Sequence, residues 1–335
     1  MELVSRPHVD NFIEWSRSRP EVLVLSADLT NSCEVGAWRD TFPERFVTAG
    51  MAEQNMLGVA AGLAREGFVP FVHTFAVFIY RRAYDQLAMS IAYPNLKVRM
   101  VGFLPGIVTP GGVTHQAIED IAIMRATPNM TVVETGDATE VESVLDAIEH
   151  VDGPVYVRML RGEIPRLFPV DEPMQLGQSR LLSEGDDVTV ITAGIATEEA
   201  MRAATALSAA GVGITHVHVN THKPFGDEIL DDAIRRARHG VITLENHVVT
   251  GGLGSAVSEY VTDRGIGTRV MRLGLIDTYA HGASKPYLMH EYGLDALALT
   301  RAVETLTNTT LGIDQSDLAE IRLDAVHSAA KAEAL

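Results

Sequence analysis

Cysteine is nearly absent from this sequence, in which Cys33 is the only one among 335 residues. A lone cysteine cannot form an intrachain disulfide, and it does not supply the ligand set of a cysteine-based metal cluster. No hydrophobic run approaches the roughly 20 residues of a membrane-spanning helix. The residues after Met1 also lack the basic region and apolar core of a secretion signal. We therefore expect a cytoplasmic protein with no membrane segment.

Positive charge is scarce as well. The chain holds 27 Lys and Arg residues against 44 Asp and Glu residues, which gives a formal net charge of −17. Nucleic acids and anionic membranes both favour clustered Lys and Arg, so neither is an expected partner. An anionic substrate would have to be held by a local basic site against the net charge of the chain. The length is sufficient for two domains that each have a core.

Strand patterns alternate with helical patterns in two series along the chain. The first series contains strand candidates at residues 21–28, 69–73, 97–102, 131–134 and 154–158. The second series contains candidates at residues 188–194, 213–219, 240–245 and 269–274. Such alternation is typical of parallel sheets that are covered by helices on both faces. Prolines interrupt the pattern between the two series, so we predict two doubly wound α/β domains, residues 1–168 and 187–335, joined by a linker at 169–186.

Glu53 is the acidic residue whose surroundings are most informative. It lies between a strand pattern that begins at Phe46 and an apolar, small-residue helical pattern at residues 57–64. On the first turn of such a helix its carboxyl group would be buried, which costs free energy without a partner and raises the pKa of the group. Enzymes use carboxyl groups of this kind for proton transfer. Taken alone, Glu53 also fits a purely structural role at the helix N-terminus.

Three further groups of residues follow predicted strands, at the edge where open α/β sheets place their ligands. Phe75 and Phe78 could stack on a flat ring or pack in the core. His115 lies in a glycine-rich loop before a helical pattern, a position that favours ligand contact and proton exchange with a hydroxyl group. Arg161 follows the last strand of the first series, and arginine is the preferred side chain for phosphate.

The segment AGMAEQNMLGVAAGLAREGFVPFVHTFAVF, residues 49–78, resembles the pyrimidine-binding domain of thiamine diphosphate enzymes of the transketolase and deoxyxylulose-phosphate synthase group. The resemblance implies that Glu53 hydrogen-bonds the aminopyrimidine ring of the cofactor and promotes ylide formation. It also implies that Phe75 stacks against this ring, with Phe78 close by. By the same resemblance, Asp28 occupies an acidic position near the cofactor.

The sequence Gly-Val-Thr-His-Gln at residues 112–116 resembles the GPTHQ segment of transketolases. In that family the histidine faces the substrate, so the resemblance implies that His115 contacts a substrate hydroxyl group. It places Arg161 where the family binds the terminal phosphate of a sugar. Arg6 and Ser32 stand where the family supplies further phosphate contacts.

Two positions depart from the transketolase pattern. Phe103 stands where the family has a second histidine, and Gly111 stands where it has an aspartate. The family residues contact the phosphate and a substrate hydroxyl group, respectively. Their absence implies that the substrate is not the usual pentose phosphate, and we expect a branched or otherwise unusual sugar.

The family's N-terminal domain has no counterpart in the sequence. Its signature, Gly-Asp-Gly followed by Asn, holds the diphosphate and Mg²⁺, and Val151-Asp152-Gly153 lacks the first glycine. The segment ENHVVTGGLGS, residues 245–255, resembles the family's C-terminal domain, which serves packing and subunit association. The resemblance therefore implies one subunit of a split enzyme. A partner subunit would carry the metal ligands, and an α2β2 heterotetramer is the simplest assembly.

These expectations combine into a thiamine diphosphate-dependent transketolase, which moves a two-carbon ketol unit between sugar phosphates. Other readings stay open at this point. The segment RAYDQL, residues 82–87, also resembles deoxyxylulose-phosphate synthases, which condense pyruvate with an aldehyde. The β subunit of a 2-oxo acid dehydrogenase E1 component is a third possibility. A catalytically silent scaffold or regulatory subunit is a fourth.

Overall fold

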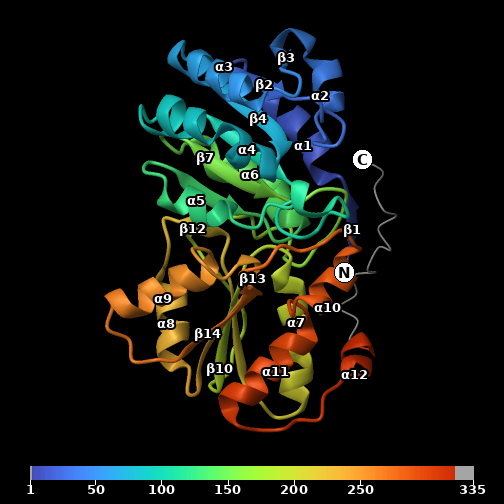
Figure 1. Cartoon of the computed structure of the whole chain (residues 1–335), viewed down its shortest axis with the longest axis vertical. Coiled ribbons are helices and arrows are strands. Elements are labelled where there is room, and N and C mark those ends of the chain that lie inside the picture. Colours follow the sequence, from blue (N-terminus) through green and yellow to red (C-terminus); the bar gives the residue numbers. More distant parts are fainter. Residues whose placement is uncertain (1, 321–335) are drawn as a thin grey trace.

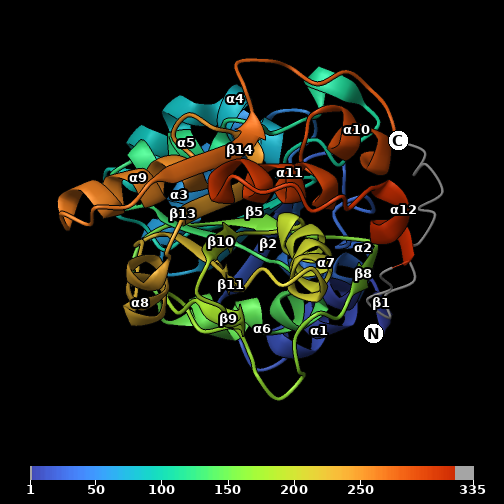
Figure 2. The ribbon, with the colours of Figure 1, turned by 90° about the horizontal axis from the view of Figure 1, so that it is seen from below.

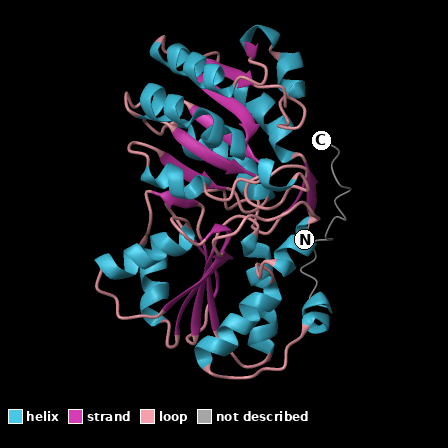
Figure 3. Ribbon diagram, viewed as in Figure 1, coloured by secondary structure: helices cyan, strands magenta, loops and turns pink. Residues whose placement is uncertain are grey.

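The computed structural model describes residues 2–320 and contains two α/β units stacked along the longest axis of the molecule (Figure 1). Helices lie around each sheet, as Figure 3 shows by colour. This arrangement confirms the predicted α/β fold class. Residues 321–335, with which the predicted second domain ends, lie outside the described residues. In the described part of the chain, no helix has both the length and the apolar character that a membrane span requires.

The first unit is built on a seven-stranded sheet with the order β12-β6-β7-β5-β4-β2-β3. Its strands are β2 (Val22–Ser26), β3 (Phe46–Thr48), β4 (Val69–Phe75), β5 (Arg99–Phe103), β6 (Thr131–Glu134), β7 (Val155–Met159) and β12 (Thr221–Lys223). All neighbouring strands are parallel except β12, which pairs antiparallel with β6. Because β12 comes from the C-terminal half of the sequence, the chain crosses back to complete this sheet. A separate two-stranded ribbon joins β1 (Leu3–Ser5) to β8 (Glu163–Pro165).

Helical segments connect these strands. They are α1 (Pro7–Ser16), α2 (Gly36–Thr41), η1 (Pro43–Arg45), α3 (Glu53–Arg65), α4 (Ala76–Asp85), the π-helical η2 (Gln86–Ala92), η3 (Gly112–Thr114), α5 (Asp120–Ala126) and α6 (Ala138–Glu149). The start of α6 has a local cause, because the side chain of Asp137 accepts a hydrogen bond from the backbone N–H of Glu140.

The second unit is built on a five-stranded sheet with the order β14-β13-β10-β11-β9. Its strands are β9 (Arg180–Ser183), β10 (Val188–Thr192), β11 (Ile214–His218), β13 (Gly240–Val248) and β14 (Val270–Leu275). Its helices are α7 (Ala196–Ala209), α8 (Glu228–Arg236), α9 (Leu253–Asp263), α10 (Lys285–Glu291), α11 (Ala296–Thr307) and α12 (Gln315–Glu320), which surround the sheet in Figure 2. β9 lies within the segment expected to be a linker, and it pairs antiparallel with β11 at one edge of the sheet.

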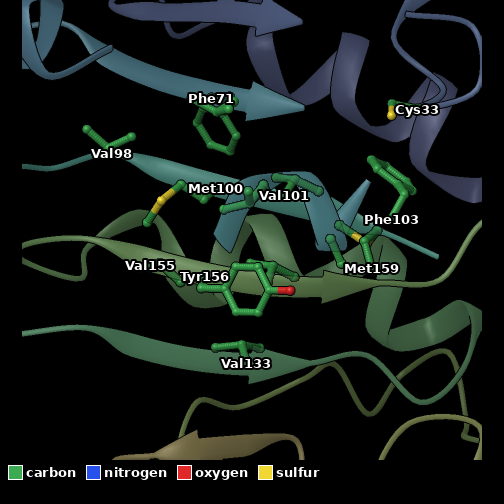
Figure 4. Packing of buried hydrophobic residues seen from close by; sticks show 14 of the residues in the cluster. Cys33, Phe71, Val98, Met100, Val101, Phe103, Val133, Val155, Tyr156 and Met159 are labelled. Carbon is green, nitrogen blue, oxygen red and sulfur yellow. The ribbon is translucent and has the colours of Figure 1, made fainter. Parts of the chain in front are cut away.

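The first unit buries aromatic side chains between its sheet and its helices. Phe12 of α1 packs on Trp38 and Phe71, with ring centroids 5.7 Å and 5.1 Å apart. Figure 4 shows side chains of β4, β5 and β7 in this buried layer, among them Phe71, Met100 and Tyr156. Strands that are buried on both faces need such continuous apolar runs, which is why the sequence pattern revealed them.

A buried cluster of charges joins the two units. The guanidinium group of Arg158 on β7 donates to Asp120 of α5 at 2.8 Å and to Glu134 of β6 at 2.6 Å. It also donates to the backbone oxygens of Ala117 and Asn246, the latter at 3.2 Å in the second unit. The side chain of Arg158 has no exposed surface. The charge of Arg158 is therefore balanced by two carboxylates of the first unit, and the second unit adds a backbone oxygen.

His222 of β12 completes this cluster, with its Nε2 atom 2.7 Å from a carboxylate oxygen of Glu134. Burial alone would raise the pKa of Glu134, but the charge of Arg158 and the contact with His222 hold that pKa at about 2. Tyr156 donates a further hydrogen bond to Asp120 at 2.6 Å. Glu134 thus keeps a lowered pKa inside the protein because it has two specific partners, Arg158 and His222.

We predict that Arg158→Met destabilises the protein by about 3–5 kcal/mol, because it leaves two buried carboxylates without their cation. Urea unfolding measures the loss. Arg17→Met is the control, since Arg17 pairs with Glu14 on the surface and surface changes alter stability by about 0.5 kcal/mol or less. A loss for Arg158→Met that is no larger than the loss for Arg17→Met would contradict the role given to the cluster.

Candidate active site

The candidate residues meet at the carboxyl ends of the parallel strands of the first sheet. Glu53 is the first residue of α3, after β3, and Phe75 is the last residue of β4. His115 lies in the connection from β5 to α5, and Arg161 follows the end of β7 by two residues. Parallel strands deliver their carboxyl ends to one edge, so residues far apart in the sequence come together there.

Glu53 is buried, and its carboxylate pairs with Arg82 of α4. The Oε1 atom of Glu53 accepts a hydrogen bond from Nη1 of Arg82 at 2.9 Å, while the Glu53 side chain is only 2% exposed. The guanidinium group of Arg82 also lies over the ring of Phe78, with Cζ 3.9 Å from the ring centroid. A buried carboxylate therefore lies beside an aromatic face that already accepts one flat, hydrogen-bonding group.

Phe75, Phe78 and His115 form an aromatic cluster next to this pair. The two phenylalanine rings stack with centroids 5.9 Å apart. The His115 ring stands edge-on to both, at 6.1 Å from Phe75 and 5.5 Å from Phe78. The Nδ1 atom of His115 lies 2.8 Å from the hydroxyl oxygen of Thr114, which fixes the direction of the imidazole ring. The sequence left core packing open for these phenylalanines; both are buried, and together they make one wall of the cluster.

Arg161 extends the row through its contact with Phe75. Its Cζ atom lies 5.4 Å from the centroid of the Phe75 ring, and its Nη1 atom donates to the backbone oxygen of Ser32 at 2.6 Å. The backbone N–H of Arg6 donates to Gly162 at 2.7 Å, so the chain at Arg6 lies beside the residue that follows Arg161. The structure thus brings Arg6, Ser32 and Arg161 together.

Asp28 lies at the same edge of the sheet. It follows the end of β2 by two residues, and it is exposed. Its place near a cofactor stays a prediction.

The two departures from the transketolase pattern have different structural surroundings. Phe103 is completely buried at the end of β5, where its ring meets His8 edge-on at 5.7 Å and lies 6.0 Å from His73. It therefore adds an apolar ring to the core where the family has an imidazole. Gly111 lies against His115, because an added Cβ atom would be 3.0 Å from the Cβ and Cγ atoms of that histidine. A larger residue at position 111 would press on His115.

Sequence reasoning did not select Arg82 or Arg81 as site residues. Arg82 was visible only as part of the segment 82–87, and nothing local in the sequence pairs it with Glu53. Arg81 holds the His115 loop from outside, because it donates to the backbone oxygen of Val113 at 3.0 Å and to both carboxylate oxygens of Glu119 at 2.8 Å. The Arg82–Glu53 pair and the contacts of Arg81 both form because α4 packs across the ends of the strands.

Acidic and histidine side chains do not gather into a metal site in the part of the chain that the structure describes. Within residues 2–320, no group of three or more His, Cys, Asp or Glu side chains could hold a metal ion. The arrangement instead offers a buried carboxylate, two stacked phenylalanines, a histidine at their edge and an arginine beside each phenylalanine. Such a row can bind a flat heterocycle and, beside it, an anionic molecule with hydroxyl groups.

Comparison with known proteins places this chain in a family. Two family models match: the transketolase pyrimidine binding domain over residues 10–166 and the transketolase C-terminal domain over residues 177–299. The chain is 38% identical to the 6-deoxy-6-sulfo-D-fructose transketolase subunit SqwH of Clostridium sp. (strain MSTE9), over 90% of this chain and 93% of that protein.

A solved structure and a longer relative show the same likeness. A split gene transketolase, solved as an inactive β4 tetramer, is 38% identical with a TM-score of 0.82, over 90% of this chain and 97% of that chain. The 1-deoxy-D-xylulose-5-phosphate synthase 1 of Geobacter sulfurreducens is 33% identical over 88% of this chain, but the match covers only 46% of that synthase. The chain therefore belongs to the transketolase family.

Proposed function

We propose that this chain is the subunit of a split, thiamine diphosphate-dependent transketolase that carries the pyrimidine-binding and C-terminal domains. The observation that carries the proposal is the unbroken row of contacts from Glu53 through Arg82, Phe78 and His115 to Phe75, and on to Arg161. The similar proteins named as a transketolase subunit and as a split gene transketolase support the division between two chains.

The proposed division of the chain follows the two sheets except at two strands: β9 lies in the linker but pairs in the second sheet, and β12 lies in the C-terminal domain but completes the first sheet. We assign residues 1–168 to the pyrimidine-binding domain, 169–186 to the linker and 187–335 to the C-terminal domain. A partner subunit carries the diphosphate and Mg²⁺ site, and the two subunits form an α2β2 heterotetramer. The pair works in the cytoplasm, where a free, buried thiol such as that of Cys33 stays reduced.

The residues present fit the aminopyrimidine end of thiamine diphosphate. The guanidinium group of Arg82 is planar and donates hydrogen bonds, and it already lies on Phe78 while paired with Glu53. The aminopyrimidine ring is also planar and carries nitrogen atoms that form hydrogen bonds. It therefore suits the same two partners, an aromatic ring and a carboxylate. Bound thiamine diphosphate supplies the electron sink through which the two-carbon unit is transferred.

The chain's own residues then have distinct tasks. Glu53 holds a proton at the ring nitrogen, in a buried place where a charged carboxylate needs a partner. Phe75 and Phe78 orient the ring by stacking. His115 contacts a substrate hydroxyl group and exchanges its proton.

The proposed substrate is an unusual anionic sugar. Arg161, Arg6 and Ser32 bind its terminal anion. The apolar ring of Phe103 supplies no hydrogen bond where the family has a histidine, and Gly111 leaves out a carboxylate. The relative named for 6-deoxy-6-sulfo-D-fructose makes a sugar with a terminal sulfonate the first substrate to test.

Two-carbon transfer by the assembled pair tests the function directly. The chain is expressed with the product of its neighbouring gene and assayed with thiamine diphosphate and Mg²⁺. The donor panel contains xylulose 5-phosphate, fructose 6-phosphate and 6-deoxy-6-sulfofructose. We expect transfer by the pair only, with neither subunit active alone, and a preference for a donor other than xylulose 5-phosphate. Release of CO₂ from pyruvate without ketol transfer would instead support the synthase-like or dehydrogenase-like alternatives.

We predict that Glu53→Gln lowers kcat of the pair by about 10²–10⁴-fold, the usual contribution of a positioned acid–base group. Glu66→Gln, an exposed change at the other end of α3, is the matched control and should leave kcat unchanged. Circular dichroism of each variant verifies the fold, and steady-state kinetics measures kcat. Activity of Glu53→Gln within tenfold of the wild type would remove Glu53 from the mechanism.

We predict that Arg161→Met raises KM for a phosphorylated or sulfonated donor by about 10–100-fold, because hydrogen bonds to a charged group contribute about 1.5–3 kcal/mol. A neutral ketose should lose far less, since it has no terminal anion. Arg39→Met, on the surface at α2, serves as the control. An equal loss for charged and neutral donors would show that Arg161 does not bind the anion.

A further inference from the structure

The loop that carries His115 belongs to the first unit by sequence but is anchored in the second. Ile107 and Ile118 flank His115 in the connection from β5 to α5, and both are buried in the hydrophobic core of the second unit. Ala280 and Leu288 belong to the same core. Two large apolar side chains on either side of His115 therefore gain their burial from the other unit, which ties the loop to it.

Asn246, at the end region of β13, holds the start of this loop through both groups of its amide. Its Nδ2 atom donates to the backbone oxygen of Pro105 at 3.1 Å, and its Oδ1 atom accepts from the backbone N–H of Ile107 at 2.9 Å. Between these two residues, Gly106 has a φ of 68°, and an added Cβ atom would overlap the Asn246 amide. A buried side chain thus satisfies backbone groups of this turn, which also forms an isolated β-bridge with Ala117.

The second unit holds the loop through a second set of contacts, at the residues next to His115. These contacts come from the connection between β14 and α10, residues 276–284, which passes along the first unit (Figures 1 and 2). Gln116 is buried and donates from Nε2 to the backbone oxygen of His281 at 3.3 Å. An added Cβ atom on Gly282 would lie 2.5 Å from the backbone oxygen of Pro110. The two backbones therefore touch, and no side chain can be placed between them.

The first unit also contacts the loop, through other residues. Arg81 donates to the backbone oxygen of Val113, and the side chain of His115 leans edge-on against Phe75 and Phe78. The imidazole ring and the backbone at Val113 thus meet the first unit, while the start of the loop and Gln116 also meet the second. A shift of the second unit's braces would move His115 relative to the phenylalanines.

We propose that Asn246 and Gly282 are positioning residues for His115, which gives the C-terminal domain a part in substrate binding beyond packing and subunit association. Neither residue touches the row of site residues, so each acts through the loop. The role given to His115 rests on the proposed function. The brace, meaning the contacts of Asn246 and Gly282 with the loop, does not depend on it. A misplacement of about 1 Å is sufficient to cost an enzyme about 10²-fold in rate.

A double-mutant cycle between Gly282 and His115 in the assembled pair tests the proposal. Gly282→Ala should lower kcat/KM by about 10–100-fold in the wild-type background. In a His115→Ala background the same change should cost less than about twofold, because there is no longer an imidazole to misplace. Gly267→Ala is the control, since an added Cβ atom there meets nothing within 4 Å. An equal loss in both backgrounds would overturn the proposal.

Hydrogen exchange provides a readout that does not depend on activity. Gly282→Ala and Asn246→Ala should both speed amide exchange in residues 104–118, whereas Gly267→Ala should not. Unchanged exchange in this segment for both variants would overturn the brace. If the wild-type pair shows no ketol transfer but the segment responds, the proposed function fails while the brace stands.

Discussion

The charge of Arg158 has to be balanced in a place that water does not reach, and much of the structure depends on how this is done. Its partners come from β6, from the start of α5 and from the end of β13. Two elements of this cluster also border the site: α5, which holds Asp120, follows the His115 loop, and β7, which holds Arg158, leads into Arg161. A buried charge without partners costs free energy. The contacts that Arg158 needs therefore link the interface between the two units to the geometry of the site.

The site is shared between the units more deeply than a family resemblance suggests. Glu53, Phe75 and Arg161 stand on elements of the first sheet, where strand ends fix them directly. His115 stands on a long connection with little regular structure, and such a segment needs outside contacts to hold one conformation. The second unit supplies these through apolar burial and the amide of Asn246. A domain that holds none of the site residues thus contacts the segment that carries His115.

The charge at the site differs from the charge of the whole chain. The chain carries a net charge of −17, yet Arg161 stands at one end of the row of site residues, and Arg82 stands near the other end, paired with Glu53. A local cation such as Arg161 can attract an anion against the field of the whole chain. Phe103 is a buried ring that packs against His8 and His73, whereas Gly111 leaves room for His115.

The sequence by itself determined the α/β class, the positions of the central strands and the motifs around Glu53 and His115, because periodicity and turn residues act over a few neighbours. It could not pair Glu53 with Arg82, place Phe103 in the core or find β9 inside the expected linker. Only the tertiary structure decided what holds His115: the partners in the bonds from Ile107 to Asn246 and from Gln116 to His281 are 139 and 165 residues apart in the chain. No local pattern encodes such contacts, since they exist only once two separately patterned sheets have packed together.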